Sequence, residues 1–206
     1  METEIIRNLR SLAIAKAYSP EAAEYVGEAL DYPSDKVKCK ALWVLGEMGL
    51  RRPDVVAPYV PAVAALLSNK DSAVRERAVN ALGRIGRSDF SLIEPYWQKL
   101  FDYAQDEAPN VRFMFIWASE NIATTNPQLY GSRMDVFARL LNDTDPRVRI
   151  EAPEIFRVIG KRMPQFVFPY IGKLKHIATN DTGRVIRIHA AGAVNTTIKS
   201  QMSDRS

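Results

Sequence analysis

The sequence predicts an all-α protein, a right-handed α-solenoid (an α–α superhelix) in which about five helical hairpins follow an N-terminal helix. The first observation behind this is a fixed period of 37 residues, marked by five framing valines: Val37, Val74, Val111, Val148 and Val185. The second is that apolar residues recur around each valine with helical spacing. Periods of about 20–50 residues indicate a repeat array in which each unit stacks on its neighbours. No strand is expected.

The chain opens with one helix and then the first hairpin. Residues 4–17 carry apolar side chains on one helix face. Tyr18-Ser19-Pro20 ends this helix, because proline disfavours helix at the residue before it but suits a new first turn. A second helix is predicted over about 20–31. Ser34 or Asp35 can cap a third helix that runs to about Gly49.

The first helix of each later hairpin is predicted to be bent. These helices span about 54–68, 90–104, 127–142 and 164–179, and their apolar positions repeat on the same period. A proline costs little in the first turn of a helix and otherwise bends it. A Pro-Tyr pair recurs in three of the four copies, at Pro58-Tyr59, Pro95-Tyr96 and Pro169-Tyr170, and Ser132-Arg133 replaces it in the other.

The second helix of each hairpin holds the framing valine. The positions 4, 8 and 11 residues after the valine fall on the same helix face and are apolar in most copies. Gly49, Gly86 and Gly160 follow this face and are interpreted as helix-ending glycines. The last copy has His189 and Thr196 on this face. A terminal repeat is expected to weaken in this way, because one side of it faces water.

Two stretches identify the repeat type. Residues 61–75 read Pro-Ala-Val-Ala-Ala-Leu-Leu-Ser-Asn-Lys-Asp-Ser-Ala-Val-Arg, and residues 140–152 read Leu-Leu-Asn-Asp-Thr-Asp-Pro-Arg-Val-Arg-Ile-Glu-Ala. Both resemble the HEAT repeat, including the HEAT-like repeats of the phycobilin-lyase type, and the resemblance covers about residues 20–198. It implies a fold and is almost silent on function. Departures are Phe115 and His189 in place of alanine, Pro153 inside a helix, where a local distortion is expected, and Ile186 in place of a basic residue.

Composition fits an ordinary globular protein. The 206 residues carry a net charge of +4, a balance that permits nucleic-acid binding without arguing for it. The single cysteine, Cys39, excludes an intramolecular disulfide. The acidic N-terminus is not a secretory signal, and no apolar run is long enough for a transmembrane helix. We expect a cytoplasmic protein with one repeat domain over residues 1–198 and a polar tail over 199–206.

A basic residue follows four of the framing valines, at Lys38, Arg75, Arg112 and Arg149. In HEAT-like arrays such residues pair with acidic residues of neighbouring repeats, which is the structural interpretation. The alternative is a phosphate-binding edge formed with helix N-termini, and the interleaved acidic residues count against it.

The opposite face of the second helices is the candidate binding surface, because in a stacked array it should line the concave groove. Trp43 and Trp117 lie at its centre, six residues after their valines, and tryptophan and arginine are enriched at binding hot spots. We therefore predict that a protein segment binds along this partner face, which comprises Trp43, Arg77, Asn80, Arg84, Trp117 and Asn121. The structural alternative is that both indoles lie flat against neighbouring helices.

The sequence contains no motif for catalysis, a cofactor or a small-molecule substrate. His176 and His189 lack the close-spaced partners of a metal site; His189 is expected inside the protein and His176 on its surface. Nothing marks a bilin site. One enzymatic alternative stays open, because some HEAT-like proteins are DNA glycosylases for alkylated bases. The residues that could take those roles are Trp43, Trp117, Arg77, Arg84 and Glu120.

Overall fold

A computed structural model describes residues 1–203 of the chain. The chain forms two compact units, Met1–Tyr103 (the first unit) and Ala104–Ser206 (the second unit). All regular secondary structure in the described residues is α-helix or 3-10 helix, and it forms the predicted opening helix and five hairpins. The predicted all-α fold class is confirmed. The grouping of residues 1–198 into one domain stays a prediction.

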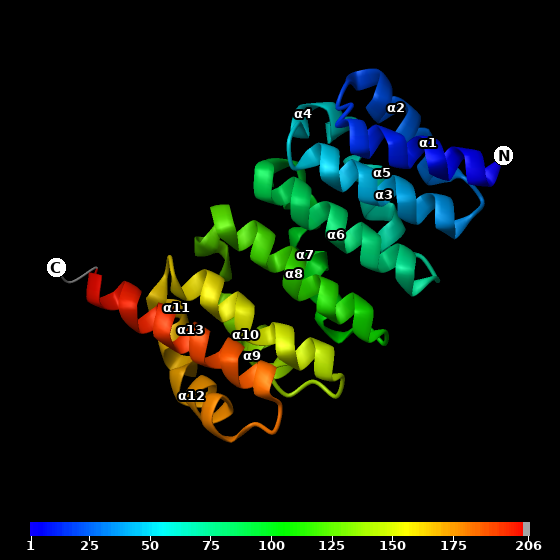
Figure 1. The fold of residues 1–206 in the computed structure, drawn as a ribbon. Coiled ribbons are helices and arrows are strands. Elements are labelled where there is room, and N and C mark those ends of the chain that lie inside the picture. Colours follow the sequence, from blue (N-terminus) through cyan, green and yellow to red (C-terminus); the bar gives the residue numbers. More distant parts are fainter. Residues whose placement is uncertain (204–206) are drawn as a thin grey trace. The chain divides into compact units, whose positions relative to one another are not determined.

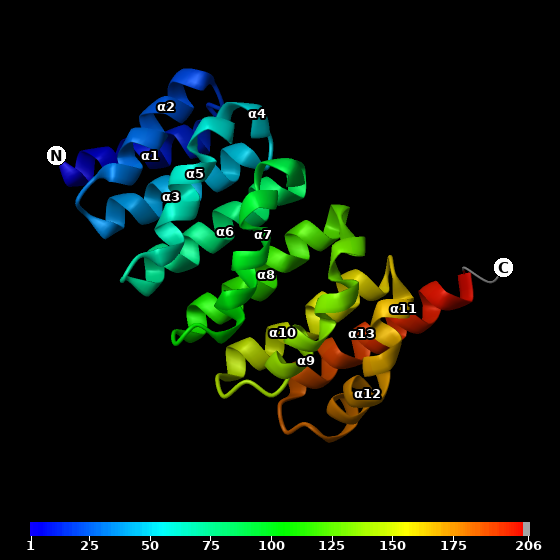
Figure 2. The ribbon, with the colours of Figure 1, turned by 180° about the vertical axis from the view of Figure 1, so that it is seen from behind.

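The first unit has two layers of helices. In one layer α1 (Glu2–Ala15) packs on α3 (Asp35–Gly49), and α3 packs on α6 (Ser72–Ser88), as Figure 1 shows. The other layer is seen from behind in Figure 2. It contains α2 (Pro20–Glu28), η1 (Ala29–Asp31), α4 (Pro53–Val56), η2 (Ala57–Tyr59), α5 (Val60–Ala65), η3 (Leu66–Ser68), η4 (Phe90–Leu92), η5 (Glu94–Tyr96) and α7 (Trp97–Leu100). η6 (Phe101–Gln105) leads into the second unit.

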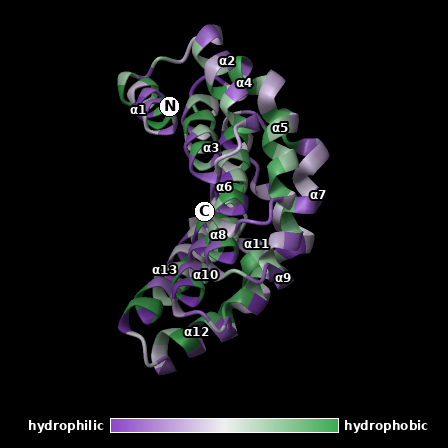
Figure 3. Cartoon of the chain, turned by 90° about the vertical axis from the view of Figure 1, so that its right-hand side faces the viewer, coloured by the Kyte–Doolittle hydropathy of each residue, from purple (hydrophilic) through white to green (hydrophobic). Residues whose placement is uncertain are grey.

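The second unit repeats the arrangement. Here α10 (Pro146–Gly160) packs between α8 (Pro109–Thr125) and α13 (Arg184–Ser203). The other layer contains η7 (Pro127–Arg133), α9 (Met134–Leu140), α11 (Pro164–Val167), η8 (Phe168–Tyr170) and α12 (Ile171–Asn180). Side-on, each helix shows both hydrophobic and hydrophilic residues (Figure 3), as amphipathic helices packed in two layers require.

The first helices of the hairpins are bent where the Pro-Tyr pairs lie. Pro58, Pro95 and Pro169 each fall in a short 3-10 segment between or before α-helical turns. A proline has no N–H to donate to the preceding turn, so the α-helical hydrogen bonding is interrupted there. The predicted bend is confirmed.

The first four framing valines are core residues. Val37, Val74, Val111 and Val148 are each 0% exposed, and the residues 4, 8 and 11 positions further on are buried with them. Full burial of one valine side chain contributes roughly 1.5–3 kcal/mol of hydrophobic free energy. The 37-residue period in the sequence therefore reflects the same buried row of side chains in each of these four repeats.

The fifth framing valine was wrongly placed in the core. Val185 is 48% exposed, whereas the next residue, Ile186, is only 3% exposed. The buried face of α13 continues through Ala190, not His189, so the whole face has moved by one residue. Ile186, read from the sequence as a departure from the pattern, occupies the valine position of this repeat.

The end of α12 explains the shift. Leu174 and Ile177 are buried and still follow the 37-residue period, whereas Ile186 lies one residue late. In the hairpin that holds Val74, the first helix ends in the 3-10 turn η3. In the last hairpin, α12 stays α-helical to Asn180. A turn of α-helix holds 3.6 residues and a 3-10 turn holds 3.0, so the α-helical ending takes up the extra residue.

A repeated arginine contact, which we name the arginine clamp, holds the turn before each of four second helices. In each clamp Nη1 donates to the backbone carbonyls six and five residues earlier; Arg75, for example, donates to Asn69 at 2.9 Å and to Lys70 at 3.0 Å. Arg112, Arg149 and Arg187 repeat these contacts. The arginines that follow the framing positions thus serve the fold, and in the last repeat this arginine is Arg187, which follows Ile186.

One clamp also carries the predicted ion pair between repeats. Arg112 donates from Nε and Nη2 to the two carboxylate oxygens of Asp143, both at 2.7 Å. The guanidinium hydrogen bond lowers the pKa of Asp143 against the raising effect of burial, which is the largest single influence. Lys38 instead approaches Asp35 of its own helix, at 3.8 Å.

Gly49, Gly86 and Gly160 follow the buried face of their helices, and two of them lie where the next helix packs closely. Gly49 and Gly160 do end α3 and α10, but Gly86 lies inside α6, so its interpretation as a helix-ending residue was wrong. No glycine among the described residues has a positive φ angle. A Cβ on Gly49 would overlap Ile85, and one on Gly160 would overlap Thr197 Oγ1. These glycines are therefore needed for the approach of the next helix.

The third repeat accommodates its large core residue by aromatic stacking. The Phe115 ring lies parallel to Phe137, with centroids 5.3 Å apart. Tyr130 is fully buried beside them and donates to the backbone oxygen of Ser119 at 2.9 Å.

Elsewhere in the unit, α10 continues through Pro153 without interruption, so the expected distortion does not break the helix.

No helix within residues 1–203 is long and apolar enough to cross a membrane. A cytoplasmic location stays a prediction from the sequence. Residues 199–203 of the predicted polar tail continue α13 as helix, and the rest of that tail lies outside the described residues.

Candidate functional site

In the first unit the partner face surrounds a half-buried tryptophan. Trp43 lies on α3, and its ring borders a hollow of about 220 Å³ that is also lined by Lys36, Cys39, Lys40 and Arg77. The Lys40 ammonium sits 4.5 Å from the centroid of the Trp43 ring, a cation–π contact. The hollow thus combines a flat apolar ring with three basic side chains.

The side chains around this hollow shift the pKa values of two of its lining residues. Partial burial lowers the pKa of Lys40, and the nearby charges of Arg10 and Arg77 lower it further. Burial also raises the pKa of the Cys39 thiol to about 11, and Asp71 adds to this, so the thiol stays protonated at neutral pH. Cys39 therefore contributes shape to the hollow and not a reactive thiolate.

The other two residues of the partner face in the first unit lie on α6 and are less accessible. Arg84 donates to Glu47 across the α3–α6 contact, so its charge is partly neutralised. Asn80 is only 5% exposed. The sequence placed both on an outward face without revealing how far the neighbouring helix covers them.

In the second unit the partner face includes Trp117 and Asn121 of α8. Trp117 is half-buried, and Asn121 is 7% exposed and donates its amide to the backbone oxygen of Trp117 at 3.0 Å. The hydrogen bond spans one helical turn. It ties the asparagine to its own helix and leaves it little surface for a partner.

A group of three carboxyl groups lies beside these residues. Burial, followed by the charges of Glu151 and Glu154, raises the pKa of Glu120 to about 9. Burial and the charge of Glu154 raise the pKa of Glu151 as well. Glu154 accepts a 2.6 Å hydrogen bond from Arg157 Nε and lies 3.2 Å from His189 Nδ1. Like charges in a partly buried site cannot all ionise cheaply, so Glu120 is protonated at neutral pH.

The histidines do not join a metal site. His189 was expected in the core but is half-buried beside Glu154, because α13 is shifted by one residue. His176 is exposed, as predicted. Within residues 1–203 no cluster of histidine, cysteine and carboxyl groups could hold a metal ion.

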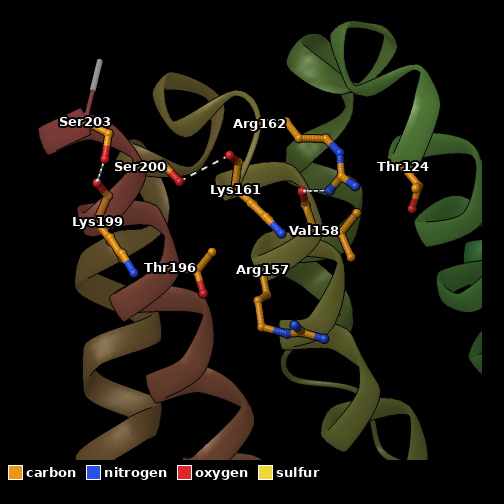
Figure 4. Close-up of a pocket in the computed structure, with 9 residues that line it drawn as sticks. All are labelled: Thr124, Arg157, Val158, Lys161, Arg162, Thr196, Lys199, Ser200 and Ser203. Carbon is orange, nitrogen blue, oxygen red and sulfur yellow. Dashed lines mark hydrogen bonds between the residues drawn. The ribbon is translucent and has the colours of Figure 1, made fainter. Parts of the chain in front are cut away.

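A second hollow of about 610 Å³ lies at the C-terminal ends of α10 and α13, and Thr124 of α8 closes one side of it (Figure 4). The sequence patterns did not predict this hollow. Four basic side chains line it: Arg157, Lys161, Arg162 and Lys199. The available signal was the spacing of basic residues at the end of α10, where Arg157 and the following Lys161 are four residues apart, about one helical turn.

The bent first helices, the buried row of framing residues and the arginine clamps define a HEAT-like helical-repeat protein. Residues 24–168, more than half of the 206-residue chain, match the family model described as "Sister chromatid cohesion protein PDS5 protein", and the chain belongs to this family. The predicted membership of a HEAT-repeat family is confirmed. No curated protein matches the sequence.

Solved structures with a similar fold include designed repeat proteins. An engineered protein shares 18% identity with a TM-score of 0.71, covering 95% of this chain and 89% of that one. A designed armadillo repeat protein in complex with the peptide (KR)4 shares 19% identity with the same TM-score of 0.71, over 93% of this chain and 91% of that one. Another, computationally designed for modular peptide recognition, shares 16% identity with a TM-score of 0.69, over 93% and 91%. At these identities the likeness is one of fold.

Proposed function

We propose that the chain is a non-enzymatic scaffold that holds a segment of another protein against the outward faces of its second helices. The observation that carries the proposal is the hollow beside Trp43, where a half-buried indole is bordered by Lys36, Lys40 and Arg77. A stiff stack of helices presents such side chains in fixed positions, so binding costs little ordering of the scaffold. A designed armadillo repeat protein of similar fold that is in complex with a peptide, and another that was designed for peptide recognition, support a protein partner.

The charges suggest what the segment presents. Beside Trp43 the basic side chains favour an apolar residue flanked by a carboxylate. In the second unit Trp117 would provide the apolar contact, with Glu151 available to a basic residue, because Glu154 is already held by Arg157. Arg84 would act as a polar contact. Asn80 and Asn121 would contribute only through the few amide atoms that reach the surface.

DNA binding and base excision are the alternative, and two observations disfavour them. Glu120 is protonated at neutral pH, so it does not supply the ionised carboxylate that the glycosylase role requires. Glu151 and Glu154 lie beside it, where a phosphate backbone would be repelled. Binding to duplex DNA that weakens steeply with salt would favour this alternative.

The test compares the three tryptophans. Segments selected from a peptide display library on the intact protein are labelled with a fluorophore and titrated while the anisotropy of the label is followed. Trp43→Ala, and Trp43→Ala combined with Trp117→Ala, are expected to weaken binding about tenfold or more each. Each variant should melt within a few degrees of the wild type. The control Tyr25→Ala removes another partly exposed aromatic side chain of the first unit and should leave binding intact.

Trp97 provides the structural reference. It is buried in edge contacts with Phe90 and Phe101, so Trp97→Ala should cost roughly 3–5 kcal/mol of stability. If Trp43→Ala destabilises the fold as much as Trp97→Ala, the indole of Trp43 is structural and the proposal fails. Unchanged peptide affinity in a stable Trp43→Ala variant would also refute it.

A further inference from the structure

The hollow at the ends of α10 and α13 has a composition that the protein-binding role does not use. Its basic side chains come from α10 and the turn that follows it, at Arg157, Lys161 and Arg162, and from α13, at Lys199. Hydroxyl groups complete the lining, at Thr124, Thr196, Ser200 and Ser203 (Figure 4). Among the described lining residues none is acidic. Its volume of about 610 Å³ lies in the range of small-ligand pockets.

The basic groups differ in how far the protein already neutralises them. Arg157 is hydrogen-bonded to Glu154, and Arg162 Nη1 donates to the backbone oxygen of Val158 at 3.0 Å. Arg162 thus satisfies a carbonyl in the last turn of α10, a common role for a basic residue at a helix C-terminus. Within residues 1–203, the ammonium groups of Lys161 and Lys199 have neither a hydrogen bond nor an ion pair. Two lysines therefore remain available at one hollow.

The hydroxyl groups have a defined orientation. Ser200 donates to the backbone oxygen of Lys161 at 3.1 Å, Ser203 to that of Lys199 at 3.2 Å, and Thr124 to that of Glu120 at 2.8 Å. Because these protons are committed to carbonyl groups, the oxygens can only accept further hydrogen bonds. A ligand that fits this lining carries anionic oxygens for the lysines and O–H or N–H donors nearby.

We propose that this hollow binds a phosphomonoester group, held by Lys161 and Lys199 with Arg162 at its edge. A phosphomonoester carries about −1.5 to −2 charges in a compact group with three acceptor oxygens, which suits a hollow lined by several cations. A phosphodiester backbone spreads single charges along its length and needs a long basic strip. Here the basic group is instead preceded on α10 by Glu151 and Glu154, six and three residues before Arg157. The inference is independent of the proposed scaffold role.

The experiment measures binding by the intact protein with calorimetry and ³¹P NMR. Two probes distinguish the source of the ester: glycerol 3-phosphate as a free ester, and a short peptide with one phosphoserine, compared with its unphosphorylated form. Saturable binding of glycerol 3-phosphate would identify small free esters as ligands. Binding of the phosphopeptide alone would identify a phosphorylated protein segment as the source.

Matched variants assign the binding to the hollow. Lys161→Glu with Lys199→Glu should weaken binding about tenfold or more, whereas Lys161→Arg with Lys199→Arg should largely retain it. The control is Lys175→Glu with Arg184→Glu, which changes the net charge equally at exposed positions of the same unit. Circular dichroism confirms that each variant is folded.

Three results would overturn the proposal. One is the absence of saturable binding of both esters at millimolar concentration. Another is an equal loss of affinity in the two charge-reversal variants, which would show a general attraction to the basic protein. The third is tighter binding of duplex DNA than of either ester at equal phosphate concentration, lost in Lys161→Glu with Lys199→Glu.

Discussion

Gly160 lies where α10 meets Thr197 of α13, and a single methyl group there would have no room. Gly160→Ala is therefore expected to lower the free energy of unfolding by about 1–3 kcal/mol, because the new Cβ overlaps the fully buried Thr197. Urea denaturation measures the change.

The matched control is Gly192→Ala on α13, where a Cβ would lie at an ordinary 3.6 Å from Arg157 Cδ. Because alanine favours helix over glycine, this variant should gain up to about 1 kcal/mol. If both alanines shift stability in the same direction by similar amounts, close packing at Gly160 is not the reason for the glycine.

Glu120 makes the stability of the protein depend on pH. Its pKa is raised from 4.5 to about 9, mainly by burial, so the folded state keeps a proton that the unfolded state releases over this range. The folded state therefore binds more protons, and stability falls as pH rises from about 4.5 to about 9. The raised pKa of Glu151 acts in the same direction.

Glu120→Gln should remove most of this dependence, because glutamine cannot ionise. The variant is expected to exceed the wild type in stability by a few kcal/mol near pH 8, and by much less near pH 5. Denaturation at several pH values tests this. The control Glu94→Gln removes an exposed carboxyl and should follow the wild type. Parallel pH profiles for Glu120→Gln and the wild type would contradict the assignment.

At the scale of the element, α13 shows that one extra residue rotates a whole helix face. Ile186→Ala should cost about 2–4 kcal/mol, because it empties a buried position. Val185→Ala should change stability by less than about 0.5 kcal/mol, because Val185 is largely exposed. Thermal and urea unfolding compare the two. A larger loss at Val185 would mean that the helix keeps the 37-residue register.

The bent first helices show a second property of the elements. They join α-helical and 3-10 turns, and the two kinds of turn hold different numbers of residues. A segment of this kind can gain a residue by changing its last turn and still satisfy its backbone hydrogen bonds. The ending of α12 is the case observed here.

At the scale of the molecule, the sequence predicted the fold well because the period, the buried row and the prolines all reflect local spacing. Four framing valines, the bends at Pro58, Pro95 and Pro169, and the hairpin order are confirmed. The prediction that Val185 is buried was wrong, because the 37-residue period was assumed to continue past the end of α12. The sequence does not show whether that helix ends in an α-helical or a 3-10 turn. Val185 and Ile186 are both apolar, so hydrophobicity alone could not separate them.

The candidate site was less predictable, for a physical reason. A helical projection gives the direction of a side chain but not how far a neighbouring helix covers it. Asn80 and Asn121 point away from the valine row and are nevertheless buried. The hollow lined by Lys161 and Lys199 joins residues 38 positions apart, and their proximity depends on how α10 packs on α13. The role of the partner face stays a prediction.

The arginine clamp has a consequence for how such a chain can be rearranged. Each clamp joins the start of a second helix to the turn just before it, and its contacts span only six residues of sequence. A cut placed after the clamp would therefore transfer the turn, its carbonyl groups and its arginine together. Modules exchanged between copies at that point would carry their own closed turn, which makes the residue after each clamp arginine the natural junction for shuffling repeats.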